Sequence, residues 1–216
     1  MSENILYFAY GSNLNQEDLN QWKAKKPKWK NTDLTVHKVS IAYLWGHRLG
    51  FTRTAPSREN MGVADIVESD DPQSRVWGVI FALTLEQDRA IADKEGSPNS
   101  YKPIKIEVVD EKGSRHMCLT YLAVVENEKK RKYLYHMPSE KYYEVIRKGG
   151  KEHGLPEEFF EHLKTASVTE RNPVAIRMND TSGMVILTPE EAAKRSRPSL
   201  KERLKQMRLK HSPKTS

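Results

Sequence analysis

The sequence contains almost no cysteine and no long apolar run. Among its 216 residues Cys118 is the only cysteine, which excludes an internal disulfide and favours a reducing compartment. No apolar run approaches the roughly 20 residues that a bilayer-spanning helix needs. The first four residues also lack the charged-then-apolar layout of a secretory signal. We therefore expect a cytoplasmic protein that does not enter a membrane.

Motifs for metals, nucleotides and serine nucleophiles are missing as well. The seven histidines show no paired spacing of the kind that zinc sites use, and one cysteine adds no ligand set. The sequence has neither a Walker-type phosphate loop nor the glycine fingerprint of dinucleotide-binding folds. Ser12 lacks the Gly-x-Ser-x-Gly elbow of hydrolases. These absences predict no metal and no nucleotide cofactor, and they give no reason to treat Ser12 as a nucleophile.

Basic residues are concentrated at the C-terminal end of the chain. The net charge is +7, and residues 167–216 hold 11 Lys and Arg against 5 Asp and Glu, which leaves 25 against 24 in residues 1–166. We expect one folded domain over residues 1–166 and a basic extension over 167–216, with a short hairpin (174–178 and 184–187) followed by helices. Charge confined to an extension is typical of a solvated or interaction segment, so nucleic acid is not an expected partner.

The stretch 5–14, Ile-Leu-Tyr-Phe-Ala-Tyr-Gly-Ser-Asn-Leu, is the most informative part of the sequence. Its apolar first half predicts a buried strand. Gly11 permits a sharp backbone bend, and Ser12, Asn13 and Asn15 are all good caps for the helix that should follow. A strand–Gly–helix junction leaves amide N–H groups free to bind a carboxylate or a carbonyl oxygen that gains negative charge.

Residues 1–166 contain about seven expected strands and four expected helices, and several neighbouring strands are joined by short turns. The pattern predicts an α+β fold whose largely antiparallel strands curl into a small barrel. The segment 47–52 is expected to return beside the strand before it, residues 53–60 to form a loop, and Gly149-Gly150 to interrupt a helix. The expected strands are 5–10, 34–44, 47–52, 62–67, 76–83, 101–109 and 115–125, and the expected helices are 14–22, 84–96, 139–148 and 156–166.

Glu95 is the candidate general acid or base in the sequence. It lies at the C-terminal end of the helix 84–96, where the helix dipole disfavours a carboxylate. If Glu95 faces an apolar cavity, loss of hydration would raise its pKa towards neutrality, as a general acid or base requires. The alternative is a solvated glutamate at a surface turn, and the sequence pattern leaves both open.

Four segments, in the same order along the chain, resemble those of the γ-glutamylcyclotransferase family. Tyr7 to Leu14 resembles its hallmark loop, and 76–80 its strand before the acidic helix. Residues 93–108 resemble its catalytic segment, and 141–159 its C-terminal helical segment. The resemblance spans about residues 5–166 and implies a small mixed barrel flanked by helices.

The resemblance also implies a chemistry. The family cleaves γ-glutamyl amides: the α-amine of the substrate attacks its own γ-carbonyl, which yields 5-oxoproline and a free amine or amino acid. This implies a small-molecule γ-glutamyl substrate and no metal or cofactor, and it leaves a homodimer open. Glu95 matches the acid/base of the family, and the substrate-binding residues that match are Tyr10, Gly11, Ser12, Asn13, Tyr101 and Tyr142.

Two alternatives and two departures accompany this prediction. The leaving group could instead be that of a γ-glutamylamine or a γ-glutamyl-protected biosynthetic intermediate, or the chain could be a non-catalytic domain whose basic extension binds an acidic partner.

Lys102-Pro103 departs from the family pattern and suggests a bend at the start of a strand. The segment 44–61 does not align, and an arginine in it could bind a substrate carboxylate or be solvated; the candidates are Arg48, Arg53 and Arg58.

Overall fold

The computed structural model describes residues 4–167, 178–179 and 183–184. Runs of consecutive strands are separated by helices along the described residues, and three of the helices are short 3-10 helices (η). The elements are β1 (Ile5–Ala9), η1 (Ser12–Leu14), α1 (Gln16–Ala24), β2 (His37–Trp45), β3 (His47–Ala55), η2 (Pro56–Arg58), β4 (Met61–Glu68), β5 (Arg75–Leu83), α2 (Leu85–Lys94), β6 (Tyr101–Asp110), β7 (Arg115–Ala123), η3 (Glu128–Tyr133), α3 (Glu140–His153), α4 (Glu157–Ala166), β8 (Met178–Asn179) and β9 (Gly183–Met184).

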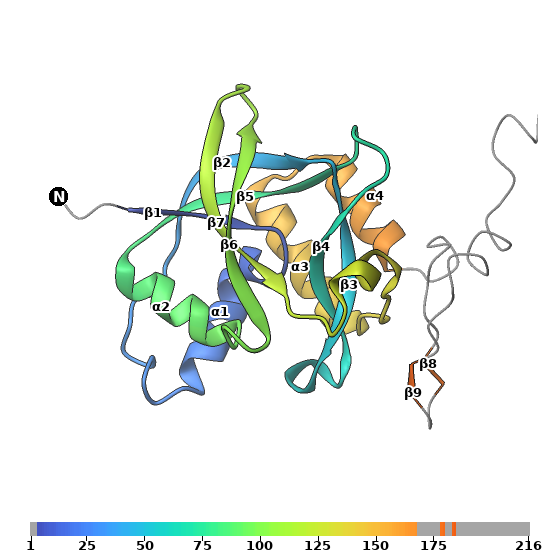
Figure 1. The fold of residues 1–216 in the computed structure, drawn as a ribbon. Coiled ribbons are helices and arrows are strands. Elements are labelled where there is room, and N and C mark those ends of the chain that lie inside the picture. Colours follow the sequence, from blue (N-terminus) through green and yellow to red (C-terminus); the bar gives the residue numbers. More distant parts are fainter. Residues whose placement is uncertain (1–3, 168–177, 180–182, 185–216) are drawn as a thin grey trace, which may run out of the picture.

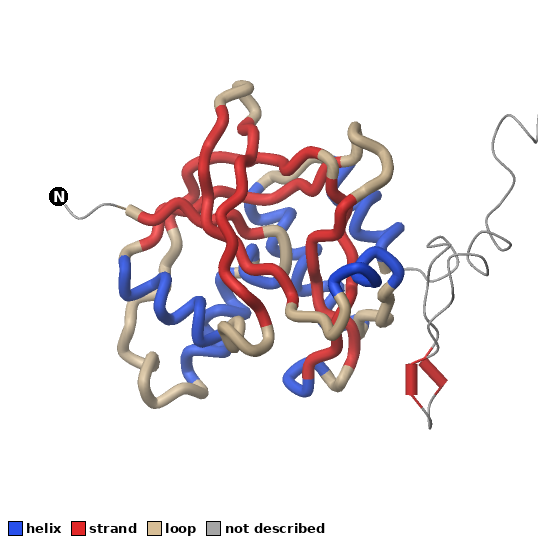
Figure 2. Tube along the Cα trace, viewed as in Figure 1, coloured by secondary structure: helices blue, strands red, loops and turns tan. Residues whose placement is uncertain are grey.

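Five strands close into a barrel in the order β1-β5-β2-β6-β7. All neighbours are antiparallel except β1 and β7, which are parallel and close the ring. Buried apolar side chains of β1 and β5, such as Phe8, Ile80 and Phe81, fill the core. In Figure 1, α1 and α2 lie on one side of the barrel and the β3–β4 ribbon, α3 and α4 on the other, and Figure 2 separates strands from helices by colour. The predicted small, mixed, largely antiparallel barrel flanked by helices is confirmed.

The expectation that β3 returns beside β2 is wrong. β3 pairs with β4 in a separate two-stranded ribbon that runs from His47↔Glu68 to Ala55↔Met61. Both edges of β2 are already taken, since β5 pairs along one edge and β6 along part of the other. Gly46, in the left-handed region at φ +69°, turns the chain towards β4. The ribbon therefore covers part of the segment that was expected to be a loop.

The expected helix break at Gly149-Gly150 is also wrong, and Pro103 is accommodated within its strand. α3 continues through Gly149 and Gly150, and these glycines let other segments pack closely against the helix. A Cβ at 149 would lie 2.7 Å from Leu14, and one at 150 would lie 2.4 Å from the Phe159 ring. Pro103 does not disturb the pairing of its strand, since β6 keeps its register with β7 throughout, and the bend expected there stays a prediction. Only β7 pairs with this part of β6, so the missing N–H of proline costs no ladder bond.

Little of the C-terminal extension is described. Met178 pairs with Met184 and Asn179 with Gly183, at the place of the predicted hairpin, while the helices expected beyond residue 188 lie outside the described residues. The boundary near residue 166 stays a prediction. Among the described residues, none of the helices has the combination of length and apolar character that crossing a membrane requires.

Candidate active site

The loop after β1 forms one wall of the site. The chain leaves the barrel at Tyr10, bends at Gly11 and enters the short turn of η1, in which Leu14 donates to the Gly11 carbonyl (3.1 Å) and Asn15 to that of Ser12 (3.0 Å). A Cβ on Gly11 would lie 3.1 Å from that of Ala64, so a larger residue has little room. The amides of residues 11–13 take no part in the two turn bonds, as expected at the start of a short helix.

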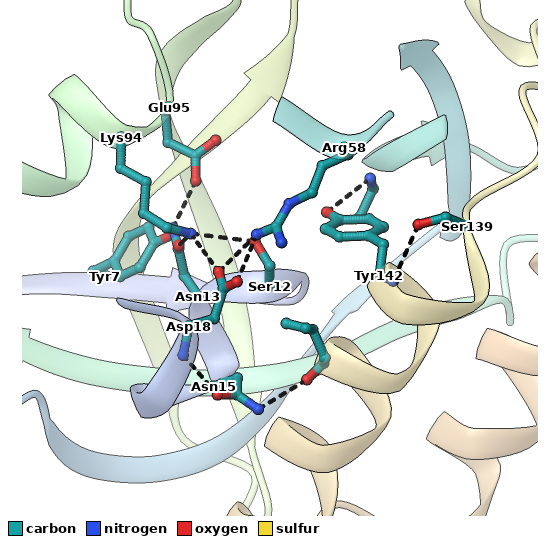
Figure 3. A network of polar contacts seen from close by, with 12 residues as sticks. Tyr7, Ser12, Asn13, Asn15, Asp18, Arg58, Lys94, Glu95, Ser139 and Tyr142 are labelled. Carbon is teal, nitrogen blue, oxygen red and sulfur yellow. Dashed lines mark hydrogen bonds and ion pairs between the residues drawn. The ribbon is translucent and has the colours of Figure 1, made fainter. Parts of the chain in front are cut away.

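Helix α2 brings Glu95 to this loop. A capping box of Thr84 and Gln87 begins the helix, and Gly96 ends it at φ +63°. Glu95, at the helix C-cap, accepts a hydrogen bond of 2.6 Å from Asn13 Nδ2, 82 residues away in sequence. The same Nδ2 donates to the Tyr7 hydroxyl at 2.8 Å. Figure 3 shows Asn13 between Tyr7 and Glu95.

The two segments enclose a small cavity of about 30 Å³, so a glutamyl group either extends beyond it or moves the side chains around it. All seven residues that the sequence suggested for the site line it. Three lining residues were missed, because the pattern assigned Tyr7 to an ordinary buried strand and gave no reason to single out Ala64 on β4 or Tyr121 on β7. The lining residues are Tyr7, Tyr10, Gly11, Ser12, Asn13, Ala64, Glu95, Tyr101, Tyr121 and Tyr142.

The tyrosine rings are held by hydrogen bonds to the backbone. Tyr101 donates to the Ala64 carbonyl (2.7 Å), and the Tyr142 hydroxyl accepts from the Ala64 amide (3.3 Å). Tyr10 donates to the Tyr121 carbonyl at 2.6 Å. Burial raises the pKa of Tyr142 to about 12, so this hydroxyl is neutral at physiological pH. The rings therefore form fixed walls and add no charge to the cavity.

The surroundings of Glu95 shift the pKa of its carboxyl. Burial raises the pKa of its carboxyl above the usual range, while Lys94, Asn13 and Arg58 oppose the rise by stabilising the charged form. Of the two alternatives for this residue, the cavity-facing one holds and the solvated one does not.

The three arginines of the segment 44–61 have different surroundings. Arg58 is paired with Asp18 through two contacts of 2.7 and 2.8 Å, lies over the Tyr142 ring and has a side chain only 20% exposed. Arg53 donates to Ser100 Oγ, and Arg48 donates to a backbone carbonyl of η3. Arg58 is therefore the one that joins the polar network around Glu95 in Figure 3, a role that no signal in the sequence indicated.

Known proteins share this architecture. Residues 75–163 match the model of the AIG2-like family. The γ-glutamylcyclotransferase of Mus musculus is 30% identical over 183 residues, covering 82% of this chain and 87% of the mouse protein. That of Homo sapiens is 29% identical over 197 residues, 89% of each chain. A solved γ-glutamyl cyclotransferase structure is similar with a TM-score of 0.61 and 27% identity, covering 89% of this chain and 98% of the other.

Proposed function

The chain belongs to the γ-glutamylcyclotransferase family, and from this premise we propose that it converts γ-glutamyl amides to 5-oxoproline with Glu95 as general acid and base. The observation that carries the proposal is the 2.6 Å hydrogen bond between Asn13 of the glycine loop and the Glu95 carboxylate, at the wall of a tyrosine-lined cavity. A carboxylate with a raised pKa is thereby held beside backbone amides that suit a carbonyl oxygen.

The reaction needs no nucleophile from the protein. The substrate's α-amine forms a new C–N bond to its γ-carbonyl carbon, and the amide C–N bond to the leaving group then breaks. Folding the substrate chain so that its two ends meet supplies the effective concentration of an intramolecular reaction. The enzyme must hold this folded conformer and move two protons from the attacking nitrogen to the leaving nitrogen, one before the attack and one after the new C–N bond has formed.

Glu95 carries that proton in the proposed mechanism. The ionised carboxylate takes a proton from the α-ammonium, which frees the amine to attack, and the resulting acid gives this proton to the leaving nitrogen as the amide breaks. The carboxylate then takes the second proton from the nitrogen of the new C–N bond and passes it to the released amine, so that 5-oxoproline keeps one N–H and the amine departs as an ammonium. Its raised pKa suits both steps, because base and acid forms then exchange closer to neutral pH. The amides of Gly11, Ser12 and Asn13 are proposed to bind the γ-carbonyl oxygen as negative charge develops on it.

Tyr10, Tyr101 and Tyr142 are proposed to enclose the glutamyl group. The first two hydroxyls donate hydrogen bonds to backbone carbonyls of the barrel and the ribbon, and the third accepts one from a backbone amide of the ribbon. The walls therefore keep their shape while the substrate folds between them. Fixed walls of this kind favour the cyclised conformer over the extended one.

A substrate panel tests the proposal. The full chain is incubated with γ-glutamyl dipeptides and with γ-glutamylamines, and 5-oxoproline and the released amine are measured by mass spectrometry. We expect equal amounts of both products from at least one substrate, and the preferred class identifies the leaving group. The absence of 5-oxoproline from every substrate would refute the proposed activity.

Location and assembly are secondary parts of the proposal. We place the enzyme in the cytoplasm, because a chain with a single cysteine does not depend on an oxidising compartment. Formation of a homodimer stays a prediction, which sedimentation of the full chain would decide.

A further inference from the structure

Lys94 precedes Glu95 at the end of α2, and its ammonium group is enclosed by three oxygen atoms. Its side chain is 7% exposed, and Nζ lies 2.7 Å from Asn13 Oδ1, 3.1 Å from Asp18 Oδ2 and 3.3 Å from Ser12 Oγ (Figure 3). An ammonium group has three N–H donors, so each donor has one acceptor here. Two of the three acceptors belong to the loop that lines the cavity.

Lys94 decides how the Asn13 amide is turned. Asn13 Oδ1 accepts from Lys94, which leaves both protons of Nδ2 for Glu95 and the Tyr7 hydroxyl. In the reverse orientation the NH₂ group would face an ammonium and the carbonyl oxygen would face a carboxylate, and both contacts are repulsive. Resting on the proposed function, we propose that Lys94, anchored by Asp18, is a positioning residue that orients Asn13 and thereby the Glu95 carboxylate.

Asp18 is a buried, charged partner that holds Lys94 in place. It lies in the first turn of α1, where a carboxylate is favoured, and its side chain is 10% exposed. Both of its oxygens accept from Arg58 Nη2. Burial alone would raise the pKa of Asp18, but Lys94 and Arg58 together lower it below its ordinary value. Asp18 is therefore charged at neutral pH and connects η2, α1 and α2 around the loop.

The charges that face Glu95 have opposite effects on its ionisation. Lys94 and Arg58 favour the carboxylate, and Asp18 disfavours it. The buried hydroxyls of five tyrosines also face the group, namely Tyr7, Tyr10, Tyr101, Tyr121 and Tyr142. Removing the charge of Lys94 should therefore raise the pKa of Glu95, whereas removing that of Asp18 should lower it.

Two variants with opposite charge changes test the inference. Lys94→Met keeps much of the side-chain length without the ammonium, and Asp18→Asn keeps the shape without the anchoring charge. Both should lower kcat on a γ-glutamyl dipeptide by roughly ten- to a hundredfold, since small displacements of a catalytic group have effects of this size. KM should change much less than kcat. The acidic limb of the kcat–pH profile should move to higher pH in Lys94→Met and to lower pH in Asp18→Asn.

Lys148→Met provides the matched control. Lys148 pairs with Glu17, the neighbour of Asp18, at 2.8 Å, and both side chains are more than half exposed. This variant removes a lysine of α3 that pairs with α1, the helix of Asp18, and neither member of the pair lines the cavity. Its kcat and pH profile should equal those of the wild type.

A titration of the Glu95 carboxyl by ¹³C NMR, with all three variants, separates this inference from the proposed function. Midpoints displaced in opposite directions in Lys94→Met and Asp18→Asn would support the coupling whether or not a substrate is found. An unmoved midpoint, even with a lowered unfolding temperature, would reduce Lys94 to a structural role and overturn the inference. If Lys94→Met does not fold, the Asp18→Asn midpoint alone decides the outcome. Lack of 5-oxoproline from the wild type would refute only the proposed function.

Discussion

Asn13 is the side chain at which the two halves of the site meet. Its one amide group contacts Tyr7 of β1, Lys94 at the end of α2 and Glu95 at the C-cap of the same helix. A carboxylate buried without such a donor would lose the hydrogen bonds of water and gain none from the protein in return. The hydrogen bond therefore allows Glu95 to be ionised within the cavity while burial still raises its pKa.

Glu95→Gln should lower activity and raise stability. Loss of the proton carrier is expected to reduce kcat by about 10²- to 10⁴-fold. Since the pKa of Glu95 is raised in the folded state, the free energy of unfolding falls as the pH rises from the ordinary carboxyl range through that raised pKa. Glutamine has no such charge, so the variant should unfold at a higher temperature near neutral pH, and the difference should vanish at low pH.

Thermal unfolding at several pH values, together with turnover, checks this prediction. Glu161→Gln, an exposed change on α4, is the control and should alter neither quantity. A Glu95→Gln variant with near-normal turnover would place the acid/base elsewhere.

The sequence predicted the site residues better than the network behind them. Tyr10, Gly11, Ser12, Asn13 and Glu95 belong to contiguous motifs, and these motifs predicted one cavity. Arg58, by contrast, lies in a segment that does not align, and its contact with Asp18 depends on where η2, which connects β3 and β4, lies relative to the start of α1. Such a pairing across 40 residues has no local signal in the sequence.

At the level of elements, one buried ion pair joins the ribbon to the barrel. Asp65 of β4 is fully buried and accepts from Thr52 Oγ1 (2.5 Å), the Ala123 amide (3.0 Å) and the Arg131 guanidinium. These partners belong to β3, the end of β7 and η3. Burial raises the pKa of Asp65, and Arg131 opposes this rise, so the carboxylate depends on its partner.

Arg131→Met should destabilise the protein by about 3–5 kcal/mol, because it leaves a buried carboxylate without its counter-charge. The double variant Asp65→Asn/Arg131→Met, which removes both charges, should lose less. Urea unfolding measures both. The loss in Arg131→Met should shrink at acidic pH, where Asp65 takes up a proton. A loss below about 1 kcal/mol, the size found for exposed pairs, would contradict this assignment.

The packing of α3 on the glycine loop gives a second prediction for an element. Gly149→Ala would bring a Cβ to 2.7 Å from Leu14 and 2.8 Å from the Asn15 amide. Overpacking of this kind costs about 1–3 kcal/mol, more than the roughly 1 kcal/mol that alanine contributes to helix propensity. Unfolding temperature and turnover should both fall, since Leu14 follows Asn13.

Lys151→Ala, an exposed change on the same helix, controls for helix propensity and should retain both quantities. If Gly149→Ala were more stable than the wild type, α3 would have room to move and the close approach would be unimportant.

Elements were predictable where local signals dominate. The capping box of Thr84 and Gln87 and the apolar run of β1 define their elements without help from the rest of the chain. The pairing of strands and the structural roles of glycines could not be predicted in this way, because they depend on residues that are distant in sequence. Which strand β3 joins is decided by the occupied edges of β2, and whether Gly149 breaks a helix is decided by the backbone that packs against it.

Across the whole molecule, the charge and the site lie in different parts of the chain. The cavity is lined by residues between Tyr7 and Tyr142, whereas residues 167–216 carry 11 basic and 5 acidic residues. The carbonyl of Ser167 accepts a hydrogen bond of 2.7 Å from the Tyr135 hydroxyl. A chain that ends at Ser167 keeps that contact and every lining residue.

Truncation after Ser167 should therefore leave catalysis intact. We expect kcat/KM within about twofold of the full chain, because every residue that lines the cavity is kept. The comparison uses the preferred substrate of the panel, with unfolding temperature as a second readout. Lower salt should change the truncated enzyme less than the full chain, since the removed segment carries most of the net charge. A large fall in unfolding temperature or in kcat would show instead that residues 168–216 pack on the domain and belong to the enzyme.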